Sequence, residues 1–278
     1  KVLDIENPYN LQEIGSGWQD IMNNRLVSVR DMWPHGNFLT LACGEDGVYP
    51  LIDISDPLEP DQVYPRIGTP GRALALVVHN DTSYVASGSG GHMQIVTMDG
   101  DSRPPQDKIQ AIFPASDKPY DIAVKGDYVY MATGKTGFKI VDPSSAEETP
   151  GLIEILSSLE TPGQALGIDI KGTNAYIADG AAGLTIIDIS SPFSPVQQEV
   201  ISVGDSCLKV AVSDNNNAYL ACGDAGIKIV NLTTKSVEAI ALSGYCTDLA
   251  LDNQNLYVAA REKVYIINRS TLTVQPFS

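Results

Sequence analysis

Apolar and polar residues alternate along this chain in short runs, and one arrangement of these runs recurs. Each copy is a strand-like run, a glycine-containing turn and a second run that ends at Asp or Asn. Period-two alternation of this kind predicts half-buried β-strands. The copies span residues 38–55, 83–99, 128–142, 175–190, 218–232 and 256–270. The first turn glycines lie 43 to 46 residues apart, a period longer than that of leucine-rich repeats.

Two further strand-like segments complete each unit. Alternating runs such as DIAVKG (121–126), ALGIDIKG (165–172) and LKVAVSD (208–214) precede the copies, and Pro-rich links such as SSPFSP (190–195) follow the third strand. No segment carries a helical stripe of ten or more residues. Four antiparallel strands repeated every 40 to 45 residues or so are typical of propeller blades. We therefore predict an all-β fold, a β-propeller of four-stranded antiparallel blades.

One unit also resembles a known repeat. The segment IADGAAGLTIIDISSP (177–192) is similar to the core of the LVIVD repeat, and the likeness is strongest over 128–142, 175–192 and 218–232. The units at 83–99 and 256–270 depart from that core. The resemblance implies a propeller located on or outside bacterial or archaeal cells, in a family whose members often lack an assigned biochemical activity.

The number of blades is open at the N-terminus. Six units have four strands each, while VLDIENP (2–8) and NLQEIG (10–15) look like the third and fourth strands of a further unit. Either a seventh blade lacks its first two strands in this chain, or six blades close and residues 1–15 lie outside or pair with another chain. We favour seven. Residues 1–278 are expected to form a single β-propeller domain, either alone or within a longer chain.

Composition narrows the class of function. The 278 residues contain 34 Asp plus Glu against 18 Lys plus Arg, which gives a net charge of −16. Such a charge repels phosphate backbones and anionic membranes, so we expect no nucleic-acid partner. No apolar run reaches the roughly 18 to 20 residues that a membrane helix needs, so we expect no direct membrane insertion. The chain starts at Lys1, which fits a processed mature chain or a trimmed fragment.

The repeated Gly-x-x-Gly turns are hairpin connections. They resemble phosphate loops, but a phosphate loop needs a following helix, and a strand follows each of them. Glycine permits the positive φ of a tight turn, which explains its recurrence. The turns occur at residues 44–47, 88–91, 134–137, 180–183 and 223–226.

In the usual propeller plan these turns share one face with the starts of the innermost strands. We predict a ligand or partner face there, formed by Asp20, Tyr120, Asp121, Gln164, Asp205 and Asp248. The same rim is expected to include Glu45, Asp46, Asp179, Asp224 and Glu262. An acidic rim could hold calcium or another divalent cation, or dock a basic partner. The plainer interpretation is that Asp caps turns and keeps the surface soluble.

Three of the four cysteines are expected near that face. Cys207 begins an inner strand, Cys222 ends the strand beside it, and Cys246 begins the inner strand of the next unit. A Cys207–Cys222 or Cys222–Cys246 disulfide, a reactive or metal-bound thiolate, and small buried apolar side chains all remain open. Cys43 is the fourth.

Catalytic constellations find little support in the sequence. His35 and His79 fall in or beside turns at the opposite face, and His92 lies in the irregular unit. No Ser-His-Asp or Cys-His set can be assembled. We therefore expect a non-catalytic protein, extracellular, at the cell surface or periplasmic, that serves as an interaction platform for another protein, in some cases within a larger assembly, or for a surface polymer. No cofactor is predicted. The alternative is a metal-dependent binder or an enzyme at the channel mouth, with Asp121, Asp248 or the thiols as ligands.

Overall fold

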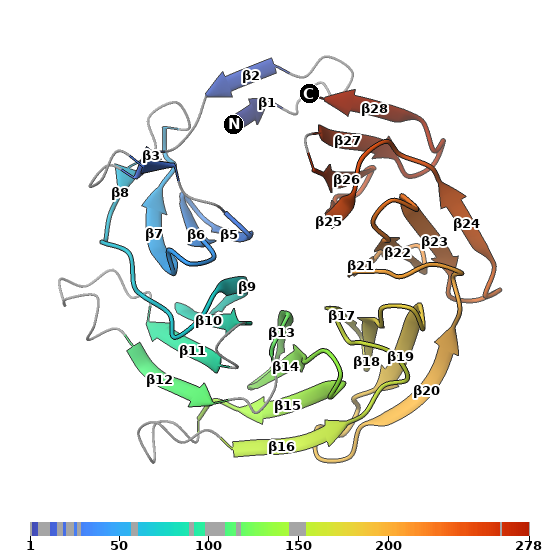
Figure 1. The fold of residues 1–278 in the computed structure, drawn as a ribbon, viewed down its shortest axis with the longest axis horizontal. Helices are drawn as coiled ribbons and strands as arrows, with labels where there is room; N and C mark the ends of the chain where they lie inside the picture. The colour runs from blue at the N-terminus through green and yellow to red at the C-terminus, as the bar shows by residue number, and fades with distance from the viewer. Residues whose placement is uncertain are drawn as a thin grey trace. The chain divides into compact units, whose positions relative to one another are not determined.

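The fold is described from a computed structural model. It describes residues 2–4, 12–15, 19–20, 25–26, 29–56, 61–88, 92–97, 109–114, 118–144, 154–261 and 263–277. All regular secondary structure in these ranges is β-strand (Figure 1). Within them, no helix has the length and apolar character needed to cross a membrane.

The strands form six antiparallel sheets of four strands, each ordered as in the sequence. Sheets I and II contain β5 (Asp31–His35), β6 (Phe38–Ala42), β7 (Val48–Asp53) and β8 (Asp61–Gln62), then β9 (Ala73–His79), β10 (Thr82–Ser87), β11 (His92–Thr97) and β12 (Ile109–Pro114). Sheets III and IV contain β13 (Asp121–Lys125), β14 (Tyr128–Ala132), β15 (Phe138–Asp142) and β16 (Glu154–Leu159), then β17 (Gly167–Lys171), β18 (Asn174–Ala178), β19 (Leu184–Asp188) and β20 (Val196–Ile201). Sheets V and VI contain β21 (Lys209–Val212), β22 (Asn217–Ala221), β23 (Ile227–Asn231) and β24 (Val237–Ile240), then β25 (Cys246–Leu251), β26 (Asn255–Ala260), β27 (Lys263–Asn268) and β28 (Val274–Phe277).

The favoured count of seven sheets is not confirmed, because the described residues contain six four-stranded sheets. The predicted half-unit forms a separate two-stranded antiparallel sheet, β1 (Val2–Asp4) with β2 (Gln12–Gly15). This pairing matches the expected third and fourth strands. A further short pair, β3 (Gln19–Asp20) with β4 (Arg25–Leu26), lies before sheet I.

The chain divides into two compact units. Unit 1 comprises residues 1–131 and 141–155, and unit 2 comprises residues 132–140 and 156–278. Unit 1 therefore holds sheets I and II with β13, and unit 2 holds sheets IV, V and VI.

Period-two alternation builds the core of unit 2. Ala218 and Leu220 of β22 pack on the Tyr176 face of sheet IV in one hydrophobic cluster. Their neighbour Tyr219 points the other way and packs with Leu256 of sheet VI in a second cluster. Successive side chains of one strand thus bury themselves against two different sheets, as the pleat requires. Sheet V is consequently apolar on both faces, with sheets IV and VI beside it (Figure 1).

Candidate functional site

The Gly-x-x-Gly turns of unit 2 share one backbone framework. In the turn between β18 and β19, the Asp179 N–H donates to the Gly183 carbonyl (2.8 Å), and the Gly183 N–H donates to the Gly180 carbonyl (3.1 Å). Gly183 has φ +89°, and an added Cβ would meet the Ile201 carbonyl oxygen at 2.5 Å. Only glycine fits such a position without displacement of backbone. The turn is therefore fixed by its glycines.

Each of these turns is also fastened to the next sheet. Gly180 forms an antiparallel bridge with Cys207, and Gly223 forms the same bridge with Cys246. Gly134 bridges Ala165 in the same way. The bridges place the turns beside the starts of the following inner strands, so these features share one face of unit 2, which we call the Gly-turn face.

The tips of these turns vary while the framework stays constant. The two central residues are Lys135 and Thr136, then Ala181 and Ala182, then Asp224 and Ala225. Lys135, Ala181 and Asp224 are exposed. A repeated rigid frame that presents different side chains is the usual arrangement of a binding surface built on loops.

Three predicted residues lie at the Gly-turn face of unit 2. Gln164 is exposed, and its N–H donates to the Asp179 carbonyl (3.3 Å). Asp205 forms an ion pair of 2.7 Å with Lys228, whose side chain is only 13% exposed. Asp248, half-buried at the start of sheet VI, accepts a hydrogen bond from the Leu249 N–H (2.8 Å). Asp205 and Asp248 are thus engaged within the chain.

The expectation that Asp179 belongs to an exposed rim is wrong. Its side chain is fully buried, and its carboxylate accepts hydrogen bonds from the Thr161 hydroxyl (2.7 Å), the Gly163 N–H (3.0 Å) and the Thr185 hydroxyl (2.9 Å). A buried carboxylate is tolerated only when its oxygens are satisfied in this way. Asp179 fastens the segment before β17 to sheet IV from inside.

The predicted residues of unit 1 divide into exposed and buried groups. Tyr120 is 36% exposed. Asp121 is buried, 3% exposed, and one of its oxygens accepts the Ile122 N–H (3.0 Å), so its carboxylate is not presented to solvent. Glu45 is paired with Arg72 at 2.6 Å, and the hydrogen bond from Arg72 lowers the pKa of that exposed carboxyl. The side chain of Asp20, and all of Glu262, lie outside the described residues.

Two of the four cysteines are bonded to each other. Cys207 and Cys222 form a disulfide that joins the start of sheet V to the end of β22. Cys43 and Cys246 are free and buried. Burial raises the pKa of the Cys43 thiol to about 12. Burial, followed by the charge of Asp224, also raises the pKa of Cys246. Both thiols are therefore protonated and poorly reactive at neutral pH.

The described ranges contain no group of three or more His, Cys, Asp and Glu side chains that could hold a metal ion. The calcium alternative thus has no candidate ligand set in those ranges. The predicted carboxylates are instead used one by one, as Asp179 and Asp205 illustrate.

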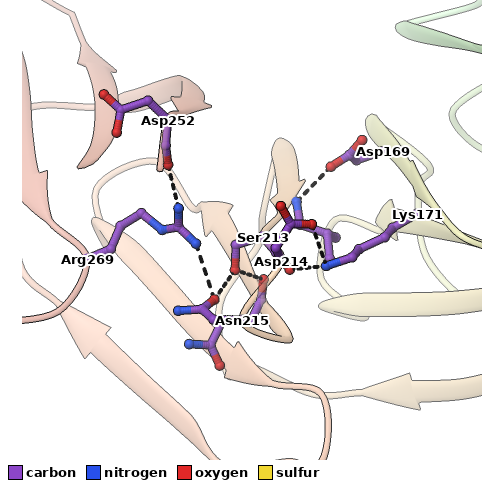
Figure 2. A network of polar contacts seen from close by, with 9 residues as sticks. Asp169, Lys171, Ser213, Asp214, Asn215, Asp252 and Arg269 are labelled. Carbon is purple, nitrogen blue, oxygen red and sulfur yellow. Dashed lines mark hydrogen bonds and ion pairs between the residues drawn. The ribbon is translucent and has the colours of Figure 1, made fainter. Parts of the chain in front are cut away.

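The turns at the opposite ends of the sheets carry a different set of polar contacts (Figure 2). Lys171, the last residue of β17 in sheet IV, donates to the Ser213 carbonyl of sheet V and pairs with Asp214 at 3.2 Å. Arg269 of sheet VI donates to the Asp252 carbonyl and, at 3.2 Å, to Asn215 Oδ1 of sheet V. These side chains connect neighbouring sheets of unit 2.

A recurring position after the third strand controls the space between sheets. The third strand ends at Asp or Asn, whose side-chain oxygen accepts the N–H two residues later, and the residue between them occupies what we call the plug position. The described plug residues are Ile54, Pro143, Ile189, Leu232 and Arg269. The N–H groups of all except Pro143 donate to a carbonyl of the first hairpin turn of their own sheet, at 2.8 or 2.9 Å.

Pro143 has no N–H, and a pocket lies beside it in unit 1. The pocket has a volume of about 190 Å³ between sheet II and the unit 1 part of sheet III. It is lined by His79, Asn80, Thr82, Tyr84, Ile95, Val124, Gly126, Asp127, Val129, Pro143 and Ser144. Sequence reasoning placed His79 at this end of the sheets and missed the rest. Superposition of the repeated units at the plug position would have revealed it.

Comparison with known proteins identifies the repeat and the fold. Residues 118–155 and 162–202 match the LVIVD repeat, so the chain carries two adjacent LVIVD repeats and the predicted resemblance is confirmed. These ranges contain β13 to β15 and β17 to β20. No curated protein matches the sequence.

Two solved structures resemble the chain at low sequence identity. The WD40 beta propeller domain of Doa1 has a TM-score of 0.73 and 13% identity, over 91% of this chain and 82% of that one. The computationally designed Ika8 protein has a TM-score of 0.65 and 12% identity, over 93% of this chain and 79% of that one. The first likeness shows a β-propeller fold, as predicted.

Proposed function

We propose that this β-propeller, which carries two LVIVD repeats, is a non-catalytic docking platform for another protein or a surface polymer, located outside the cytoplasm. One observation carries the proposal. Three turns of unit 2 share one backbone framework and one fastening to the next sheet, and they differ at their exposed tips. A rigid frame with variable tips serves recognition, because the frame lowers the entropy that binding must overcome.

The use of the carboxylates supports binding over chemistry. General acid–base catalysis needs a carboxyl group that is available to a substrate and poised near the working pH. Asp179 is buried under three hydrogen bonds, Asp121 is buried, and Asp205 is held by Lys228. These carboxylates stabilise the framework that holds the Gly-turns. The exposed residues at the tips of the turns are then the groups available to bind a partner.

The disulfide supports a location outside the cytoplasm. Disulfides persist in oxidising compartments and are rare in the cytosol, where thiols are kept reduced. The Cys207–Cys222 bond is accordingly expected in protein isolated from its source. Denatured but unreduced protein should react with two equivalents of thiol reagent, at Cys43 and Cys246. A count of four equivalents would contradict this location.

The partner of this face is expected to be basic. This expectation rests on the net charge of −16, because the three tips themselves present one acidic residue, Asp224, and one basic residue, Lys135. Complementary charge speeds association and excludes partners of the wrong sign. An anionic nucleic acid or membrane surface does not meet this condition.

The test compares the introduction of positive charge at two sites of unit 2. In the double variant Gln164→Lys/Asp224→Lys, both changes are exposed on the Gly-turn face, while Glu238→Lys is an exposed control on β24. Tagged protein is cross-linked in its source organism, and the recovered proteins are quantified. We expect one set of partners with the wild type and the control, and at least about tenfold less with the double variant, because like charges now meet. Equal recovery from all three would contradict the proposed face.

A further inference from the structure

The plug position determines what lies between two neighbouring sheets at the end opposite to the Gly-turns. Between sheets IV and V the plug is Leu232, which is 8% exposed and shares a hydrophobic cluster with Tyr176. Tyr176 lies four residues before its turn glycine, and Tyr84 and Tyr219 hold the same place in sheets II and V. A tyrosine therefore stands at the equivalent position in sheets II, IV and V.

Between sheets V and VI the plug is an arginine. The guanidinium carbon of Arg269 lies 5.8 Å from the centroid of the Tyr219 ring. One of its N–H groups donates to Asn215 Oδ1 (3.2 Å), and another donates to the Asp252 carbonyl. The guanidinium thus has an aromatic face, a side-chain amide oxygen and a turn carbonyl as partners. We call this place the filled groove, and Figure 2 shows the contacts of Arg269 with Asn215 and Asp252 in it.

Between sheet II and sheet III two of these partners have counterparts, and the plug is short. Tyr84 corresponds to Tyr219, and Asn80, like Asn215, lies two residues before the second strand of its sheet, in a shorter hairpin turn. Asp127 corresponds to Gln254, whose carbonyl accepts the Arg269 N–H (2.8 Å). Pro143 cannot donate to the carbonyl of Asp127, and its ring does not extend to the neighbouring sheet as Arg269 does. The pocket of about 190 Å³ lies here, and we call it the open groove.

We infer that the open groove is a binding site for an arginine side chain presented by a partner protein. The chain itself shows which chemistry such a groove accepts, because Arg269 fills the corresponding place beside Tyr219. The open groove offers the same tyrosine and asparagine together with the acidic residue Asp127. Its volume is below the roughly 300–1,000 Å³ of pockets that take whole small-molecule ligands, and suits a single side chain.

Arginine fits this site better than lysine. A guanidinium is planar, stacks on an aromatic ring and carries five donors in a fixed geometry, whereas an ammonium is a compact and strongly hydrated charge. The groove pairs an aromatic ring with acceptors at its edge, from Asn80, the turn at Gly126–Asp127 and the Asp127 carboxylate. The net charge of −16 also favours a cationic group.

This site is distinct from the proposed docking face. The open groove lies at the first hairpin turns of unit 1, while the proposed docking face is formed by the Gly-turns of unit 2. The variants that test the one leave the other unchanged, so either proposal can fail alone.

The experiment is an NMR titration of the isotope-labelled chain with capped arginine, N-acetyl-arginine amide. The matched probes are N-acetyl-citrulline amide, which is neutral with nearly the same shape, N-acetyl-lysine amide and free L-arginine. We expect saturable shifts of the amides of Thr82, Tyr84, Gly126 and Asp127 with the arginine amide at millimolar concentration, the range expected for a single group. Binding of citrulline and lysine amides should be at least about tenfold weaker, since the charged, stacked guanidinium is lost.

Two variants connect the shifts to the groove. Pro143→Arg supplies an intramolecular arginine, as at position 269, and should abolish the shifts. Tyr84→Leu keeps an apolar side chain against the cluster of sheets II and III but removes the aromatic face, and should weaken binding about tenfold. The amide spectrum of each variant first verifies its fold, and if one variant is unfolded the other carries the test.

Three results would overturn the inference. These are no saturable shift at the groove, equal binding of citrulline and arginine amides, or unchanged binding in a folded Pro143→Arg or Tyr84→Leu variant. Tighter binding of free L-arginine than of its capped amide would also overturn it, because the occupant would then be a small molecule and not a partner chain.

Discussion

The open groove and the filled groove share two side chains and differ in what lies between the sheets. Both present a tyrosine from the second strand of one sheet and an asparagine from the turn before that strand, Tyr84 with Asn80 and Tyr219 with Asn215. They differ at the plug position, Pro143 in one and Arg269 in the other. A repeat fold can thus create a site when the residue that fills this position elsewhere, as Leu232 and Arg269 do, is replaced by a short one.

Among replacements at the plug position, Leu232→Ala is expected to cause the largest loss of stability. Leu232 is a buried plug in the cluster with Tyr176, so Leu232→Ala should lower the free energy of unfolding by about 2–4 kcal/mol. The matched change Pro143→Ala should stay within about 1 kcal/mol of wild type, because no filled space is emptied. Urea denaturation measures both. Equal losses would show that Pro143 plugs its groove as Leu232 does.

Removal of the arginine plug should have an intermediate effect. Arg269→Ala loses the contact with Tyr219 and the hydrogen bonds to Asn215 and Asp252, which should cost about 1–2 kcal/mol. The variant should also gain a second site for arginine amide, seen as new shifts near Tyr219 in the same NMR titration. Lys263→Ala, an exposed control on β27, should change neither quantity. If a folded Arg269→Ala protein binds arginine amide at the open groove only, the two grooves are not equivalent.

A leucine at position 143 should close the open groove. Its effect on the free energy of unfolding should be smaller than that of Leu232→Ala or Arg269→Ala. Pro143→Leu restores an N–H for the Asp127 carbonyl and fills apolar space, and it loses the restriction that proline places on the unfolded chain. The net expectation is stabilisation of up to about 1 kcal/mol together with loss of arginine binding. Thermal unfolding and the titration test these outcomes. Retained arginine binding in this variant would show that the plug does not set access.

The smallest expected effect concerns Asp252, next to the filled groove, and the way the stability of the protein changes at acid pH. Burial raises the pKa of Asp252, but hydrogen bonds from Asn255, Tyr257 and Gln254 outweigh it and hold that pKa below its usual value. A carboxyl with a lowered folded-state pKa contributes stability above roughly pH 4, and this is lost as pH falls through the folded value. Asp252→Asn should therefore lose less stability between about pH 5 and pH 2 than wild type does. An identical pH profile would contradict this assignment.

The repeat made most of the fold predictable. The hairpins, the four strands per unit and the pairing of residues 2–4 with 12–15 all follow from period-two patterns and turn glycines. The favoured number of seven blades did not follow from these patterns. Two strands of a blade in a sequence do not show whether its other two strands exist elsewhere. A local pattern identifies strands, whereas the number of sheets depends on the whole chain.

The burial and the contacts of the site residues were harder to predict from the sequence. Asp179 directly precedes one Gly-turn and Asp224 lies at the exposed tip of the next, but Thr161, Gly163 and Thr185 enclose the Asp179 carboxylate, and two of these lie in a different segment. The pocket beside Pro143 has the same cause, since its other wall is Tyr84 of the preceding sheet. Contacts between neighbouring sheets decide both cases, and a pattern within one strand does not contain them.

A crystal structure of the wild-type chain with N-acetyl-arginine amide would show whether the open groove takes a guanidinium. We expect the guanidinium over the Tyr84 ring, hydrogen-bonded to Asn80 and to the Gly126–Asp127 turn, in the arrangement that Arg269 adopts over Tyr219. Density for the probe at other places only, or an open groove at a probe concentration that saturates the NMR shifts, would contradict this expectation.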